Sequence, residues 1–273
     1  MWSQWKETIA HEYFHAVQYA YYYHENWFRE ASAVWFAAKY SGSITRAKDH
    51  FDSYFENIRK SISNYPYGAG VLPMAIDVAY GGDTTIRRIY ERMDSNGAST
   101  ETALRNCITW AIQKNDSSGS FAEAYKKIGA YVTRPGHFYR SVIPSSEVNN
   151  WTNSAPIDLT ATTSIDTTSV VLNSYGCYPY FLTTNASSAK TLTITFTFPI
   201  STSGNSVRIV QKSKGNTITP RGTDATSEIY IAEVSSFISS SSASSSNITE
   251  VHATPINTSS SNNRTVIMDF QLI

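Results

Sequence analysis

The sequence predicts an α+β protein whose helices and strands lie in separate domains. Residues 1–145 place apolar side chains at helical spacing, between residues that cap or end helices. From residue 151 to residue 273, more than a third of the residues are Ser or Thr, and short runs alternate between apolar and polar side chains. We therefore expect a mostly α-helical lobe over residues 1–145, followed by an all-β sandwich domain over residues 151–273.

The helices of the first domain are bounded by residues that favour caps and turns. Asn26 is the expected N-cap of the second helix, and Ser41-Gly42 follows its end. Asp83 or Thr84 is expected to cap the fifth helix, and Ser99 or Thr100 the sixth. The predicted helical ranges are 5–23, 27–40, 45–62, 68–80, 83–93, 101–114 and 120–131.

The strands of the second domain are predicted from period-two alternation. Residues 190–198, KTLTITFTF, place apolar and hydroxyl side chains on opposite faces, as a half-buried strand requires. Further strands are expected over residues 169–172, 178–183, 207–212, 228–234 and 265–272. This domain has one histidine, His252, and no cluster of His, Cys and acidic residues. We therefore expect an accessory role for it.

Composition and charge exclude several classes of partner. The 22 basic and 22 acidic side chains give no net charge, and no Lys or Arg cluster could follow a phosphate backbone, so we expect no nucleic-acid partner. No apolar run approaches the ~20 residues of a membrane span, and the N-terminal residues show no signal-peptide pattern. Cys107 and Cys177 fall in different predicted domains, so two free thiols are favoured over a disulfide.

The first predicted helix contains the motif H-E-x-x-H, His11-Glu12-Tyr13-Phe14-His15. Residues four apart lie on one face of a helix, so both imidazoles can bind one ion while Glu12 projects beside them. Catalytic zinc takes three protein ligands and leaves a fourth position for water. The alternative is that both histidines and the glutamate merely cap or pair within a helical core.

Glu30 is the candidate third ligand. It lies in an apolar run between Trp27 and Trp35, where a carboxylate is costly to bury without a partner. Glu25 is the competing candidate, but its neighbours predict a solvated turn between two helices. Two histidines and one glutamate would then form the metal site.

These two segments resemble the gluzincin metallopeptidases. The matching stretches are HEYFHAVQ at residues 11–18 and WFREASAVW at residues 27–35, and they are similar to secreted bacterial or archaeal members with a C-terminal β-sandwich. The resemblance covers about residues 1–140. It implies a helical zinc-metallopeptidase lobe in which His11, His15 and Glu30 hold Zn²⁺ and Glu12 is the general base. It also implies an extracellular or cell-surface location. The β-sheet that the family carries upstream of the motif helix is not expected in this sequence.

A tyrosine is expected to assist the reaction. Gluzincins often use a tyrosine or histidine downstream of the ligands to donate to the developing oxyanion. Tyr67, at the start of a predicted helix, is the candidate, and Tyr65 is as well placed by sequence alone. Arg134 and His137, in a predicted loop, are weaker candidates for substrate contact.

The function expected from these observations is zinc-dependent hydrolysis of peptide bonds in proteins or peptides. An alternative is an adhesion or glycan-binding module, in which the sandwich binds the ligand and the helical lobe is inactive or truncated. A third hypothesis makes the zinc structural, with four protein ligands and no bound water.

Overall fold

The computed structural model divides the chain into two compact units, residues 1–151 and residues 152–273. It describes residues 2–21, 26–55, 57–131, 157–159, 165–178, 180–184, 190–197, 205–213, 218–223, 227–234, 248–259 and 264–272.

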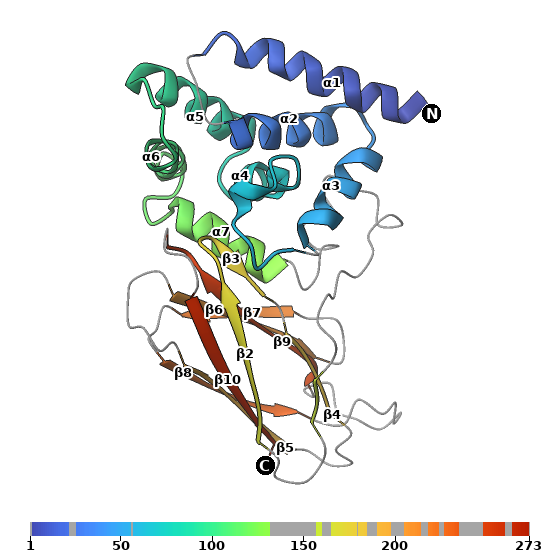
Figure 1. Cartoon of the computed structure of the whole chain (residues 1–273), viewed down its shortest axis with the longest axis vertical. Helices are drawn as coiled ribbons and strands as arrows, with labels where there is room; N and C mark the ends of the chain where they lie inside the picture. Colours follow the sequence, from blue (N-terminus) through green and yellow to red (C-terminus); the bar gives the residue numbers. More distant parts are fainter. Residues whose placement is uncertain are drawn as a thin grey trace. The chain divides into compact units, whose positions relative to one another are not determined.

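The described residues of the first unit form helices and turns (Figure 1). The α-helices are α1 (Trp2–Gln18), α2 (Asn26–Tyr40), α3 (Thr45–Phe55), α4 (Val71–Ala79), α5 (Asp83–Asn96), α6 (Glu101–Gln113) and α7 (Phe121–Tyr131). Two 3₁₀ turns, η1 (Ile62–Asn64) and η2 (Gly68–Gly70), connect α3 to α4. The helical character predicted for this part of the chain is confirmed.

The core of this unit is built around α4, which contacts α2, α5 and α7. Residues Val71 to Ile76 of α4 are all buried, and the Tyr54 and Tyr125 hydroxyls lie 3.1 Å apart in the interior. Apolar burial of this kind, at roughly 25 cal/mol per Å², stabilises the helical unit. Other large, fully buried side chains include Phe28, Phe51, Ile58, Ile62, Leu72, Met74 and Ile76.

Three local predictions are wrong. α1 ends at Gln18, five residues early, because Tyr19, Ala20 and Tyr21 donate their N–H groups to the carbonyls of a closing turn. α3 ends at Phe55, and the residues from Asn57 form turns.

The start of α5 also differs. Its N-cap is Gly82 and not Asp83 or Thr84, since the backbone of Gly82 has φ +70°, a region that favours glycine. By contrast, Thr100 caps α6 as expected, accepting a hydrogen bond from the Ala103 N–H.

The described residues of the second unit form strands. They are β1 (Ile157–Leu159), β2 (Ile165–Leu172), β3 (Gly176–Cys177), β4 (Tyr180–Thr184), β5 (Lys190–Thr197), β6 (Asn205–Ser213), β7 (Ile218–Thr223), β8 (Ser227–Val234), β9 (Ile248–Asn257) and β10 (Arg264–Leu272). Strands in this part of the chain are confirmed, and β1, β3, β7 and β9 are additional to the prediction. β9 was missed because Pro255 interrupts its pattern.

These strands pair as two groups. β8, β5, β10 and β2 follow one another through antiparallel pairs, and β7, β6, β9, β4 and β1 form the second series. One parallel residue pair, Val234 with Ile248, joins the two groups. The sandwich arrangement stays a prediction at this point. Cys107 and Cys177 are both buried, each within its own unit.

Candidate metal centre

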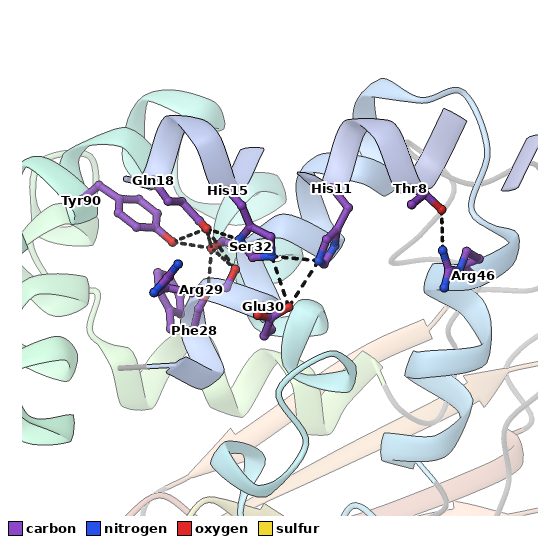
Figure 2. A network of polar contacts seen from close by, with 10 residues as sticks. All are labelled: Thr8, His11, His15, Gln18, Phe28, Arg29, Glu30, Ser32, Arg46 and Tyr90. Atoms are coloured by element: carbon purple, nitrogen blue, oxygen red, sulfur yellow. Dashed lines mark hydrogen bonds and ion pairs between the residues drawn. The ribbon is translucent and has the colours of Figure 1, made fainter. Parts of the chain in front are cut away.

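Two helices bring the predicted ligands together. His11 and His15 lie one turn apart on α1, and Glu30 lies on α2 (Figure 2). Phe14 fixes the two helices against each other, because its ring stacks on Phe36 at 4.7 Å and meets the edge of Trp35 at 6.0 Å. The apolar side chains of α1 differ in burial: Phe14 is 9% exposed, whereas Ile9 is 63% exposed.

The three donor atoms form a compact triangle. His11 Nε2 and His15 Nε2 lie 3.0 Å apart, and Glu30 Oε2 lies 3.3 Å from the first and 3.4 Å from the second. A tetrahedral ion with ligands at about 2.0–2.1 Å places its ligand atoms about 3.3 Å from one another. The triangle therefore has the dimensions of one face of a tetrahedral metal site.

The Glu30 carboxylate has an unsatisfied atom at this position. Its Oε2 is buried and has no hydrogen-bond partner, although burial of a charged oxygen without a partner is costly. A cation bound by the two imidazoles would satisfy it. Among the described residues, this group of three is the cluster of His, Cys and acidic side chains that could hold a metal ion. The residues present therefore fit a metal.

The surroundings of the His11 imidazole favour its neutral form. Burial lowers its pKa and the neighbouring His15 lowers it further, which outweighs the opposite effects of Glu30 and Glu12. A neutral imidazole offers the lone pair that a metal requires. His11 is therefore a ready ligand at neutral pH.

The structure distinguishes the two candidate tyrosines. The Tyr67 ring stacks on His11 at a centroid distance of 5.9 Å, and it also stacks on His50 at 4.9 Å. Tyr65 instead packs edge-on against Tyr54 at 5.9 Å. Burial and the negative charge of Glu30 raise the pKa of the Tyr67 phenol. Of the two tyrosines, Tyr67 is therefore the one that lies beside the candidate metal ligands.

A glycine allows Tyr67 this position. A Cβ on Gly68 would come within 2.5 Å of the Tyr54 Cβ and 2.8 Å of the His50 carbonyl oxygen on α3. Only a residue without a side chain lets η2 approach α3 so closely. This close approach places the preceding residue, Tyr67, beside His50 and His11.

A cavity of about 160 Å³ opens beside the cluster. Glu12 is exposed and lines it, so the carboxylate after the first histidine has access to a molecule bound there. The remaining lining residues are Glu7, Thr8, His11, Val34, Ala37, Arg46, Ala47, His50 and Tyr67. Of the three possible ligands, His11 lines this cavity, together with the carboxylate of Glu12 and the phenol of Tyr67.

Sequence reasoning missed several of these neighbours. His50 and Arg46, on α3, line the cavity, and Gln18 contacts His15. Gln18 lies three residues after His15, a spacing that places both on one helix face and could have revealed it. Glu25, Arg134 and His137 lie outside the described residues.

Comparisons with known proteins do not supply a function. No protein-family model matches the chain, and no curated protein matches it. Among solved structures, the Yersinia pseudotuberculosis-derived mitogen matches with a TM-score of 0.30 and 11% identity, over 40% of this chain and 86% of that chain. The pre-peptidase C-terminal domain of a Bacillus anthracis collagenase matches with a TM-score of 0.28 and 8% identity, over 43% of this chain and 95% of that chain. TM-scores this low carry no argument about function.

Proposed function

We propose that this protein is a zinc-dependent hydrolase of peptide bonds in proteins or peptides. The observation that carries the proposal is the triangle of His11 Nε2, His15 Nε2 and Glu30 Oε2, in which the buried oxygen has no other partner. Two histidines and one glutamate are a ligand set of catalytic zinc. The described residues add no fourth protein ligand to the group, which favours a catalytic over a structural ion.

Glu12 is the proposed general base. When bound, zinc supplies a water of lowered pKa and polarises the scissile carbonyl. Glu12 takes the proton of the attacking water and passes it to the leaving amine, which requires a carboxylate free to reach both. Its exposure at the wall of the cavity supports this role, since its carboxylate is not buried in the helix interface.

Tyr67 is the proposed donor to the oxyanion. A phenol whose pKa is raised keeps its proton at neutral pH and can donate it in a hydrogen bond. Tyr67 is 44% exposed, and its ring lies beside His11. Aiming such a donor at the developing charge stabilises the transition state.

The second unit is proposed to be a β-sandwich with an accessory role, and the protein to act outside the cell or at its surface. Among the described residues, a single parallel residue pair joins the two strand groups, which supports two layers, as a sandwich requires. Within the described residues, no helix has the length and apolar character needed to cross a bilayer.

The proposal is tested with Glu12→Gln and a matched control. Metal analysis of the purified chain should find one zinc per molecule in both variants and in the wild type. Casein digestion should fall at least about 100-fold in Glu12→Gln, in line with the loss of general-base catalysis. Glu91→Gln makes the same chemical change on the surface of α5, where Glu91 pairs with Arg87, and should digest casein like the wild type. Unchanged digestion by Glu12→Gln would refute the assigned base.

The alternative of a glycan-binding or adhesion module makes the opposite prediction. It requires that the wild-type chain loaded with zinc leaves casein and a mixed peptide library intact. Such a result would reject hydrolysis by this chain even if zinc is bound.

A further inference from the structure

Gln18 is the last residue of α1. It links the group of candidate metal ligands, His11, His15 and Glu30, to a buried polar network (Figure 2). Its side chain is 3% exposed and lies between His15 on its own helix and residues of α2 and α5. A buried amide is retained only where its donors and acceptor find partners, so the position of each of its atoms is informative.

The partners of Gln18 determine which way its amide points. Gln18 Nε2 lies 3.0 Å from the carbonyl oxygen of Arg29, which can only accept a hydrogen bond. The same nitrogen lies 3.0 Å from Ser32 Oγ and 2.8 Å from the Tyr90 hydroxyl. Ser32 in turn donates to the Phe28 carbonyl at 2.6 Å, so its oxygen is left to accept. The amide nitrogen therefore faces α2 and α5, and the amide oxygen faces His15.

This orientation specifies the protonation of His15. Gln18 Oε1 lies 2.6 Å from His15 Nδ1, and an amide oxygen can only accept. The proton of the neutral imidazole must then sit on Nδ1. The lone pair is on Nε2, the atom that lies 3.0 Å from His11 Nε2 and 3.4 Å from Glu30 Oε2.

We propose that Gln18 is a positioning residue that holds His15 in the tautomer and ring orientation needed to bind the metal. The inference rests on the metal site of the proposed function and not on the reaction. The two imidazoles are then held in different ways, His15 by a hydrogen bond from its Nδ1 to Gln18 and His11 by ring contacts. His11 is held by ring contacts with Tyr67 and His15, and in the described residues its Nδ1 has no hydrogen bond.

The Arg29 carbonyl keeps the amide in this orientation, and a buried network surrounds both groups. Tyr90 is buried, its hydroxyl lies 2.5 Å from Ser32 Oγ, and its ring contacts Phe14 and Phe28 of the two helices that carry the ligands. If the amide turned by 180°, its oxygen would face the Arg29 carbonyl and its NH₂ would face His15. Two acceptors in contact are unfavourable in a buried site, so only one orientation is stable.

The first experiment measures the tautomer directly in the zinc-free wild-type chain. Long-range ¹H–¹⁵N NMR spectra of the histidine side chains at pH 8 should show His15 with its proton on Nδ1, and assignment follows from comparison with His15→Gln. A proton on Nε2 would overturn the proposal. This result does not depend on zinc binding, so it separates failure of the positioning role from failure of the proposed function.

The second experiment compares Gln18→Met with Tyr90→Phe. Met keeps the length of the side chain and removes its contact with His15, so zinc affinity, measured by competition with a chromophoric chelator, should fall about 10–100-fold. Tyr90→Phe removes one hydroxyl of the same network but leaves the Gln18 contacts with His15 and Arg29. It should keep zinc affinity within about threefold of the wild type, although both variants lose folding stability.

A third variant covers the case in which Gln18→Met does not fold. Gln18→Glu keeps an acceptor for His15 Nδ1, so its zinc affinity should stay close to that of the wild type, and its NMR spectrum should retain the proton on Nδ1. Equal zinc affinity in wild type and folded Gln18→Met, or a proton on Nε2 in Gln18→Glu, would overturn the positioning role.

Discussion

The helix pair α1–α2 and the helices α4–α7 bury different kinds of side chain. In α4–α7 the buried residues are mainly apolar, and the buried polar ones are paired: Thr85 donates to the Tyr80 carbonyl, and Lys126 pairs with Glu123. In α1–α2 the interface holds Gln18 and Ser32, and it leaves Glu30 Oε2 without a hydrogen bond. A scaffold gains stability from apolar packing, whereas polar groups held unsatisfied indicate a ligand site.

The largest effect on stability is expected in the scaffold. Ile108 of α6 is fully buried, so Ile108→Ala should lower the free energy of unfolding by about 2–5 kcal/mol through lost burial and a residual cavity. Urea unfolding followed by circular dichroism measures this loss. Zinc affinity at a temperature where the variant is folded should remain that of the wild type. A parallel loss of affinity would show that the two regions are not separable.

In the metal-free chain, Glu30→Gln should change the free energy of unfolding in the opposite direction from Ile108→Ala. The change removes a buried charge without a hydrogen bond at Oε2, so the free energy of unfolding should rise by about 1–3 kcal/mol while zinc uptake is lost. Urea unfolding in the presence of a chelator and metal analysis provide the two readouts. A destabilised metal-free variant would mean that Glu30 pairs productively with the imidazoles.

Thr100→Ala tests a local feature of the scaffold. It removes the side chain that accepts from the Ala103 N–H at the start of α6, and the free energy of unfolding should fall by about 1 kcal/mol. Thr100→Ser keeps the hydroxyl and serves as the control, expected within a few tenths of a kcal/mol of the wild type. Casein digestion by both variants should equal that of the wild type.

The smallest effect concerns the contact between the two regions. Asp83 at the start of α5 pairs with Lys39 and Tyr40 at the end of α2. Burial raises the pKa of the Asp83 carboxyl, but the hydrogen bonds from Lys39 and Tyr40 outweigh it, and the pKa lies below its ordinary value. The folded state therefore favours the ionised form.

The lowered pKa of Asp83 makes the stability of the folded state depend on pH. The stabilising contribution of Asp83 is complete above the unfolded pKa of about 3.9 and is lost as the pH falls through the lower folded value. The melting temperature of the wild type should therefore decrease more steeply below about pH 4 than that of Asp83→Asn. The difference should be small, because Asp83 is half exposed. Parallel curves would show that this contact is not coupled to folding.

The sequence by itself determined what depends on local geometry. The spacing of His11 and His15 places them on one face of any α-helix. A cap at Ser99 or Thr100 is predicted because a hydroxyl there can reach an N–H of the first turn, and the structure has Thr100 in this role. The division into helical and strand-rich parts followed from side-chain periodicity, which is also local. β9 is not predicted from the local pattern because proline, here Pro255, is disfavoured in strands. In the structure, pairing with β6 and β4 outweighs this preference.

Only the tertiary structure decided how distant residues meet at the site. The packing of Phe14 on Phe36 brings Glu30 to the two imidazoles, and the close approach of Gly68 to α3 selects Tyr67 over Tyr65. The Gln18 amide is oriented by the Arg29 carbonyl on α2 and also contacts the Tyr90 hydroxyl, 72 residues away in the sequence. These arrangements depend on which helices pack together and at what angle, and no local pattern of side chains encodes that.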